Sequence, residues 1–300
     1  MTTPSVEVSH VAKSFGNTQA VSDVSFGVHG GEIFGLLGPN GAGKTTTIRI
    51  ILDLFKAERG MVSVLGGPMT EEKKARIGYM PEDRGLYQDI SLENCLVYLA
   101  TLKGLSAAEA RKRLKPQLEA FDLAQHRSKK VKELSKGMQQ KAQIIATILH
   151  EPELIFVDEP FAALDPINTQ LVKDLMRDLR ARGVTIVMST HQMHQVEELC
   201  DRIVLINKGR NVLYGHLDEI RHQYSGHAVL VRGAGPLPSV AGVEQAVPHN
   251  DAIQWTLAPG TTAQDVLKEL LAKDVVLEKF EIAFPTLEEI FIRAVEEERA

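Results

Sequence analysis

Gly38-Pro39-Asn40-Gly41-Ala42-Gly43-Lys44-Thr45 stands between an apolar run, Ile33 to Leu37, and a helix-like segment, Thr46 to Phe55. This order predicts a strand, a glycine loop and a helix. The glycines allow a tight turn, so that backbone N–H groups and the helix N-terminus converge on a phosphate chain. In this Walker A pattern, Lys44 reaches the β- and γ-phosphates and the Thr45 hydroxyl ligates magnesium. The stretch therefore predicts a nucleoside triphosphate site.

A second apolar run, Leu154 to Val157, ends in Asp158-Glu159-Pro160. It predicts a buried parallel strand, and such strands present ligand-binding side chains at their carboxyl ends. We expect Asp158 to hold magnesium, usually through water, and Glu159 to polarise the water that attacks the γ-phosphate. Two adjacent carboxylates can also be a mere turn, but the upstream glycine loop favours the catalytic interpretation.

Two further site residues are predicted from their positions beside predicted strands. His191 ends the β-branched strand that begins at Thr185. A lone histidine there is usually structural, but the ligand edge of a phosphate-binding sheet favours a γ-phosphate contact. Phe15 precedes the turn Gly16-Asn17 and could stack on an adenine. The alternative is a strand-end core aromatic, and the neighbouring motifs favour stacking.

The amino-acid composition excludes several classes of protein. The chain has 300 residues, 44% of them hydrophobic and 24% charged, which predicts two globular domains. Its formal net charge of -5 argues against broad nucleic-acid binding. The two cysteines, Cys95 and Cys200, are too few for a disulfide framework or a CxxC metal site. No signal peptide or membrane-spanning run is evident, so we expect a soluble chain whose membrane role comes through a partner.

The rest of the chain predicts an α/β organisation in two parts. Antiparallel strands precede the glycine loop, and a helical insertion occupies Ser91 to Gln125. Composition shifts at Ser225-Gly226, and beyond it lies an α/β appendage of about 75 residues. The other predicted elements are strands at 6–11, 20–28, 60–66, 76–80, 203–206, 211–214, 228–231, 243–247, 252–257 and 275–282, and helices at 141–149, 168–182, 217–222, 262–271 and 287–297.

With these residues together, positions 4 to about 222 resemble the nucleotide-binding subunit of an ATP-binding cassette (ABC) transporter. The matching motifs, in family order, are Phe15 (A-loop), Gly38 to Thr45 (Walker A), Leu134 to Met138 (signature loop), Leu154 to Glu159 (Walker B), Ala162 to Asp165 (D-loop) and His191 (switch histidine). The resemblance implies a P-loop ABC-type ATPase core with an antiparallel β subdomain and a helical subdomain at about 88–150. The expected domains are 1–224 and a small α/β domain at 225–300.

The resemblance also implies a set of site residues, with ATP and Mg²⁺ as cofactors. The expected catalytic residues are Glu159, His191 and Lys44. The expected nucleotide-binding residues are Phe15, Gly38, Pro39, Asn40, Gly41, Ala42, Gly43, Lys44, Thr45, Thr46, Ser135, Gly137 and Asp165. The expected metal ligands are Thr45, Glu82 and Asp158.

Three positions depart from the family pattern. Glu82 stands where the Q-loop usually has glutamine, and a carboxylate can ligate magnesium but donates no hydrogen bond unless protonated. In the signature loop Lys136 adds a cation that could strengthen phosphate binding or simply be solvated, and Met138 removes one polar contact. These substitutions resemble variants of one exporter-type subgroup and leave the catalytic residues intact.

The resemblance implies partners as well. In the family the signature loop of one subunit completes the site of another, so we expect a homodimer, or a heterodimer with a related cassette, in which Ser135 and Gly137 face the partner's ATP. A separately encoded transmembrane permease would hold the chain at the cytoplasmic face of the cell membrane, with no nucleic acid bound. The segment Phe284 to Phe291 resembles the C-terminal extension of bacterial type-2 exporter ATPases, which favours export.

Two other classes of protein fit the sequence less well. A soluble ABC-type ATPase acting on ribosomes or nucleic acid usually has two cassettes, a long coiled coil or a metal-binding insertion, and none is evident. A regulatory cassette without turnover is disfavoured by Glu159 and His191. The C-terminal domain could be a dimer brace, a regulatory sensor or a permease contact. The apolar stripe of the last helix, at Leu287, Ile290, Phe291 and Val295, favours the brace, unless it covers its own sheet.

Overall fold

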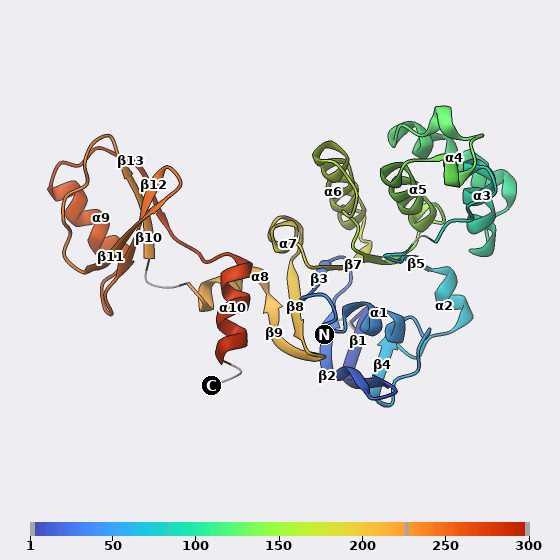
Figure 1. Cartoon of the computed structure of the whole chain (residues 1–300), viewed down its shortest axis with the longest axis horizontal. Coiled ribbons are helices and arrows are strands. Elements are labelled where there is room, and N and C mark those ends of the chain that lie inside the picture. The colour runs from blue at the N-terminus through green and yellow to red at the C-terminus, as the bar shows by residue number, and fades with distance from the viewer. Residues whose placement is uncertain (1–3, 84, 226–227, 298–300) are drawn as a thin grey trace. The chain divides into compact units, whose positions relative to one another are not determined.

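The computed structural model describes residues 4–83, 85–225 and 228–297, and the chain divides into two compact units, Met1–His216 and Leu217–Ala300. Each unit contains its own sheet (Figure 1). Helix α8 (Leu217–Gln223) belongs to the second unit, whereas the sequence placed it in the first. Gly226, at the predicted boundary, lies outside the described residues.

The first unit is built on a nine-stranded sheet in the order β4-β1-β2-β9-β8-β3-β7-β6-β5. Its strands are β1 (Val6–Phe15), β2 (Thr18–Val28), β3 (Ile33–Leu37), β4 (Arg59–Val64), β5 (Ile77–Met80), β6 (Leu154–Asp158), β7 (Thr185–Thr190), β8 (Arg202–Asn207) and β9 (Arg210–His216). Strand β1 pairs antiparallel with β2 and β4, whereas β3, β5, β6, β7 and β8 form parallel pairs. The predicted antiparallel part and parallel core are therefore both present.

The parallel strands are buried because helices cover the faces of the sheet. Every residue of β3, β6 and β7 is buried, which explains why these segments have continuous apolar runs and no alternation. Their carboxyl ends lie at one edge, since β3 and β6 both pair in parallel with β7. This edge therefore brings together the glycine loop after β3, the two carboxylates of β6 and the residues after β7.

Seven helices belong to the described part of the first unit: α1 (Lys44–Ile51), α2 (Glu71–Ala75), α3 (Leu92–Leu102), α4 (Ala107–Ala120), α5 (Lys136–Ile148), α6 (Pro166–Ala181) and α7 (Met193–Leu199). The predicted helical insertion consists of α3 and α4, which begin after the N-caps Ser91 and Ser106. Figure 1 shows α3, α4 and α5 grouped together, away from the antiparallel strands. The 3₁₀ turns η1 (Ala124–His126) and η2 (Val131–Glu133) connect α4 to α5.

Some helix bounds differ from the sequence-based expectation for local reasons. Helix α5 begins at Lys136 and not at Lys141, because the Ser135 hydroxyl accepts a hydrogen bond from Met138 N–H and caps the helix. Helix α1 ends at Ile51 and not at Phe55, and Asp53 then adopts a left-handed conformation with φ 59°. The short helices α2 and α7 were not predicted.

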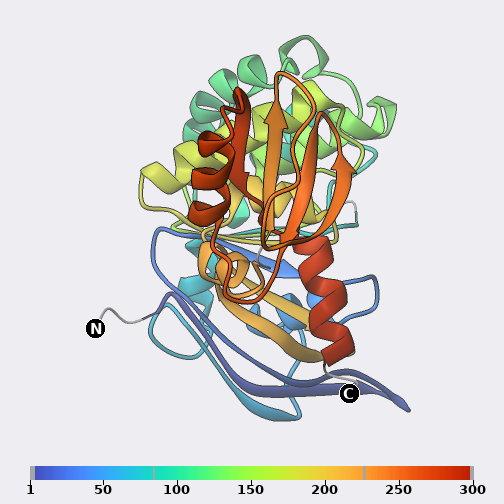
Figure 2. The same cartoon turned by 90° about the vertical axis from the view of Figure 1, so that its left-hand side faces the viewer.

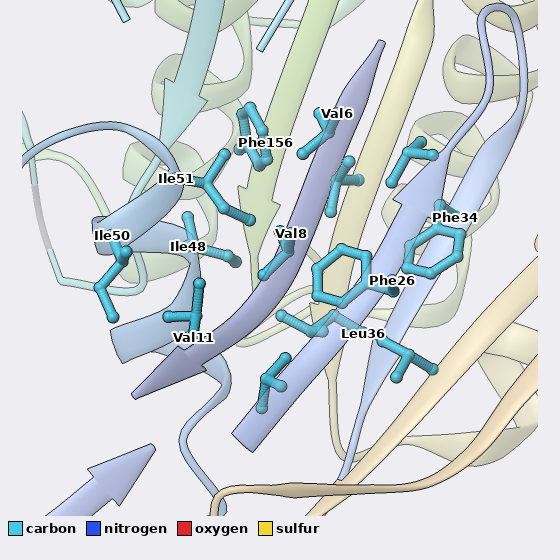
Figure 3. Packing of buried hydrophobic residues seen from close by; sticks show 14 of the residues in the cluster. Val6, Val8, Val11, Phe26, Phe34, Leu36, Ile48, Ile50, Ile51 and Phe156 are labelled. Carbon is cyan, nitrogen blue, oxygen red and sulfur yellow. The ribbon is translucent and has the colours of Figure 1, made fainter. Parts of the chain in front are cut away.

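The core around the glycine loop joins elements from both parts of the sheet. Figure 3 shows Val6, Val8 and Val11 of β1 beside Ile48 and Ile51 of α1, with Phe156 of β6 close by. Phe26 and Phe34 stack with ring centroids 5.3 Å apart. This buried cluster fixes the axis of α1, and thereby the position of the loop that precedes it.

The second unit is a four-stranded antiparallel sheet in the order β11-β12-β10-β13. Its elements are α8, β10 (Ala228–Gly233), β11 (Val243–His249), β12 (Ala252–Leu257), α9 (Ala263–Ala272), β13 (Leu277–Ile282) and α10 (Leu287–Glu297). Figure 2 shows these strands side by side with α9 against them, where Val266 and Leu270 pack on Trp255.

The apolar stripe of α10 is mostly covered within the chain. Leu287 and Ile290 are buried, and Phe291 and Val295 are half-buried. A second copy of the chain is therefore not needed to bury this stripe.

Candidate nucleotide site

The glycine loop between β3 and α1 needs its glycines for two different reasons. Gly38, Gly41 and Gly43 all have positive φ, at 147°, 78° and 107°. A Cβ at Gly38 would lie 2.1 Å from the Ile206 carbonyl oxygen, and one at Gly43 would lie 2.5 Å from that of Ala20, whereas Gly41 faces open space. Conformation alone requires glycine at position 41, while positions 38 and 43 also lack room for a side chain.

Lys44 is folded over the glycine loop at the start of α1. Its Nζ donates to the carbonyl oxygens of Gly38 at 2.9 Å and Pro39 at 3.2 Å, and only 7% of the residue is exposed. Burial lowers the pKa of Lys44, and three carboxylates oppose that effect: Glu159, Asp158 and Glu82, in decreasing order. The ammonium therefore lies in the field of the predicted catalytic and metal-binding carboxylates.

The other loop residues differ in their accessibility. Pro39, Asn40 and Gly41 are exposed, Ala42 is buried, and Thr45 and Thr46 are half-buried. Thr47 points inward and its hydroxyl donates to the Gly43 carbonyl at 2.9 Å. Thr47 therefore stabilises the first turn of α1, while Thr45 and Thr46 keep access to a ligand.

Asp158 ends β6 and is 1% exposed. The Ser189 hydroxyl of β7 donates to its Oδ1, and Ser189 is the register partner of Asp158 in the parallel pair. Its Oδ2 is buried with no hydrogen-bond partner among the described residues. Since a buried carboxylate oxygen without a partner is costly, this atom suits a cation.

Glu159 follows in a left-handed conformation, φ 50°, which is strained for a residue other than glycine. Its Oε2 accepts from the Thr190 hydroxyl at 3.0 Å. Its Oε1 accepts from the His191 backbone N–H at 3.0 Å and lies 2.7 Å from His191 Nδ1. The structure thus brings together the predicted catalytic glutamate and switch histidine, and it adds Thr190, which the sequence analysis missed.

Two glutamines of α5 hold the backbone of the neighbouring loops. Gln140 Nε2 donates to the carbonyl oxygens of Glu159 at 3.3 Å and Pro160 at 3.1 Å. Gln143 Nε2 donates to those of Pro81 at 2.6 Å and Asp83 at 3.3 Å. Residues three apart share a helix face, so one side of α5 serves both loops. No pattern in the sequence marked these glutamines.

Phe15 is 45% exposed and is not a core residue. Its ring lies edge-on to that of Phe55, with centroids 5.2 Å apart, and Lys13 Nζ is 5.5 Å from the Phe15 centroid. The structure therefore leaves an aromatic surface available at the end of β1, supported by an aromatic residue that the sequence analysis did not select.

The remaining predicted residues make local contacts within the chain. The Asp165 carboxylate caps α6 and accepts from Asn168, and these hydrogen bonds lower its pKa. Ser135 and Lys136 are exposed at the start of α5, and a Cβ at Gly137 would lie 3.2 Å from the Ala163 carbonyl oxygen. The signature segment thus lies beside the predicted D-loop and faces solvent.

Glu82 is exposed in the loop after β5. Across the described ranges, no three histidine, cysteine, aspartate or glutamate side chains are grouped to hold a metal ion. None of the described helices is long and apolar enough to cross a membrane.

The fold and the site define a P-loop ATPase, and comparisons with known proteins identify its family. Residues 21–162 match the family described as ABC transporter, and residues 215–295 match the C-terminal domain of DrrA1-3-like ATP-binding proteins. The uncharacterized ABC transporter ATP-binding protein YhaQ of Bacillus subtilis is 40% identical over 96% of this chain and 97% of its own length. The chain therefore belongs to the ABC transporter ATP-binding proteins.

Other relatives carry functional names. The linearmycin resistance ATP-binding protein LnrL of Bacillus subtilis is 30% identical over 96% of this chain and 97% of its own. The Nod factor export ATP-binding protein I of Paraburkholderia xenovorans is 37% identical over 70% of each chain. A solved ATP-binding subunit of an ABC transporter superposes with a TM-score of 0.69 and 37% identity, covering 74% of this chain and 93% of that one.

These findings confirm the predicted fold class and family. The chain is an ATP-binding and ATP-hydrolysing subunit of an ABC transporter, a class whose members work with separate transmembrane permeases. The predicted resemblance of the C-terminal part to the extension of type-2 exporter subunits is also confirmed.

Proposed function

We propose that this chain powers export, by ATP-driven association of two cassettes beneath a separately encoded permease. The observation that carries the proposal is the combination of the DrrA-like C-terminal domain with nearly full-length similarity to LnrL. The shorter similarity to a Nod factor export protein supports it. Which compound is exported would be decided by the permease.

We assign nucleotide binding to the glycine loop, Lys44 and Phe15. The backbone N–H groups of the loop, those of all residues from Gly38 to Thr46 except Pro39, would hold the phosphates at the N-terminus of α1, and the Lys44 ammonium would move from its carbonyl partners to the β- and γ-phosphates. The exposed ring of Phe15 would cover the adenine. Its edge contact with Phe55 supports this role by holding the ring in one orientation.

The donors near Lys44 suit Mg²⁺. Thr45, Asp158 and Glu82 would hold it, and the unpartnered Asp158 Oδ2 supports this assignment. Magnesium binds through one or two carboxylates together with substrate phosphates, so two carboxylates and a hydroxyl beside the glycine loop are the expected kind of donor set. When bound, the ion neutralises charge that develops on the β- and γ-phosphate oxygens.

For hydrolysis, Glu159 would orient the attacking water and accept its proton. Three hydrogen bonds from Thr190 and His191 hold this carboxylate in place. His191 Nδ1 faces Glu159, so Nε2, on the other side of the ring, would be the atom that meets a γ-phosphate oxygen. The pair would therefore link the position of the base to the presence of the γ-phosphate.

The exposed signature segment supports a two-subunit site. Ser135 and Gly137 of one subunit would bind the γ-phosphate held by the other, and Asp165 would lie nearby. Lys136 is exposed at the same helix start, where its charge would favour the phosphate. The subunits would be two copies of this chain or this chain with a related cassette.

A permease contact is supported by aromatic side chains close to Glu82 in the sequence. Tyr87 and Tyr98 are 50% and 46% exposed, and their rings meet edge-on with centroids 5.5 Å apart. Large exposed aromatics of this kind are enriched at protein interfaces. The chain would thus lie at the cytoplasmic face of the membrane through its permease, without binding nucleic acid.

The test is a pull-down of tagged Glu159→Gln protein from native membranes with ATP and magnesium. A polytopic membrane protein in the eluate supports the proposal, whereas ribosomes or nucleic acid alone would overturn it. Adding Tyr98→Glu should reduce recovery of the permease. Adding Met61→Glu, at an exposed position on β4, should leave recovery unchanged.

A further inference from the structure

The loop after β5 is fastened by a side chain from another part of the sequence. Gln143 of α5 is 5% exposed, and its Nε2 donates to the carbonyl oxygens of Pro81 and Asp83 at 2.6 and 3.3 Å. These two carbonyls flank Glu82 in the chain. The carboxamide therefore fixes the backbone on both sides of that residue.

The described residues on either side of Glu82 have few other backbone restraints. Outside helices and strands, no backbone–backbone hydrogen bond between described residues involves Pro81, Glu82 or Asp83. Gln143, by contrast, lies in the middle of α5, and its side chain is restrained by burial within the packed structure. The amide thus connects α5 to the described loop residues Pro81, Glu82 and Asp83, which have no such backbone bonds of their own.

We propose that Gln143 is a positioning residue for Glu82. The inference rests on the proposed role of Glu82 as a magnesium ligand. Both amide hydrogens of Gln143 are used on backbone acceptors, so the position requires a donor. A glutamate at 143 would face these carbonyls with acceptors only, and a methionine would leave them without a partner.

Loss of the Gln143 carboxamide should therefore weaken the affinity for magnesium, because Glu82 would be less well positioned to bind it. Substitutions behind a metal ligand typically weaken metal affinity by about 10- to 100-fold, and an exposed ligand shared with phosphates falls at the low end of that range. We expect Gln143→Met and Gln143→Glu to raise the magnesium concentration for half-maximal ATPase activity by about tenfold. Binding of ATP measured in EDTA should change less than about twofold, since the glycine loop is untouched.

The experiment is a double-mutant cycle of Gln143→Met with Glu82→Ala, in which the half-saturating magnesium concentration is measured. If Gln143 acts through Glu82, adding Gln143→Met to Glu82→Ala causes no further shift. A second readout without metal is limited proteolysis in EDTA by a glutamate-specific protease, for which cleavage after the exposed Glu82 should be faster in both Gln143 variants. Thr147→Val, which loses a buried hydrogen bond on the same helix without touching the loop, is the control for stability.

The outcomes separate the two proposals. A normal magnesium requirement in Gln143→Met beside a raised one in Glu82→Ala overturns the positioning role alone, as do additive shifts or an unchanged rate of cleavage after Glu82. A normal requirement in Glu82→Ala overturns the metal role of Glu82, and the inference with it. Thr147→Val variants that reproduce the shift would assign it to helix stability and overturn the inference.

Discussion

His191 Nδ1 lies 2.7 Å from Oε1 of Glu159, and the backbone N–H of the same histidine donates to the same oxygen at 3.0 Å. One residue thus holds the carboxylate through both its backbone and its ring. The ring contact would connect the carboxylate to a γ-phosphate bound at Nε2, whereas the backbone contact restrains the carboxylate independently of the ring. Substitutions at Glu159 and His191 should therefore have different effects.

Glu159→Gln should reduce the rate of ATP hydrolysis by about 10²- to 10⁴-fold, because an amide cannot accept the proton of the attacking water. ATP affinity should remain within about threefold, since Lys44 and the glycine loop are unchanged. Phosphate release and nucleotide binding measure the two effects. The matched control is Glu153→Gln, just before β6, where the carboxylate pairs with Arg76 at the surface. Near-normal turnover in Glu159→Gln would exclude Glu159 as the base.

Ser189→Ala should lower the free energy of unfolding by about 1–3 kcal/mol, because it removes the hydroxyl that donates to the buried carboxylate of Asp158. Urea unfolding in EDTA is the measurement. Ser22→Ala is the control, since Ser22 is also buried but its hydroxyl makes only a long contact, 3.5 Å from the Lys208 carbonyl oxygen. Equal losses in the two variants would contradict the importance of the Ser189 contact.

Gly38→Ala should destabilise the protein more than Gly41→Ala. Both positions have positive φ, which costs an alanine about 1–2 kcal/mol. Only at Gly38 would the new Cβ also meet a backbone oxygen, that of Ile206, so β8 or the loop must shift. Thermal unfolding should show the difference, and indistinguishable midpoints would indicate that the loop readily moves away from β8.

Acid should destabilise the first unit through His150. Burial lowers the pKa of His150 to about 4 from its ordinary value of 6.5, and the cations Lys103 and Arg113 act in the same direction. The unfolded chain therefore gains a proton at higher pH than the folded chain does. The stability that neutral His150 contributes is complete above pH 6.5 and is lost as the pH falls toward 4, by up to about 3 kcal/mol.

His150→Gln should lessen this pH dependence, because glutamine has no proton to gain and can still donate toward the Ile77 carbonyl, which lies 3.2 Å from His150 Nε2. Urea unfolding between pH 6.5 and 4.5 compares the two proteins. If their midpoints fall in parallel, other groups cause the acid sensitivity.

Much of the first unit was predictable because its signals are local. Continuous apolar runs identified β3 and β6, and the glycine loop between β3 and α1 identified the nucleotide site. The start of α5 was predicted five residues too late, because Ser135 was interpreted only as a ligand for phosphate. Within the chain, Ser135 also caps α5. The short helices α2 and α7 are too brief to show a period.

The supporting residues could not be predicted because their contacts depend on register and on distant packing. Ser189 and Thr190 reach Asp158 and Glu159 only because β6 and β7 pair with Asp158 opposite Ser189. Gln143 meets Pro81 across 62 positions of sequence. A glutamine on a helix is ordinary in a sequence, and only the packed structure shows what it bonds.

Helix α5 has 13 residues without interruption. At about 1.5 Å per residue, Gln143 lies roughly 12 Å along the axis from Ser135. Inserting or deleting one residue between Gln140 and Gln143 would turn one amide by about 100° relative to the other, so that only one of the two loops could remain bonded. The number of residues in this turn of α5 is therefore constrained as strictly as their identity, and length variation in this segment should not be tolerated.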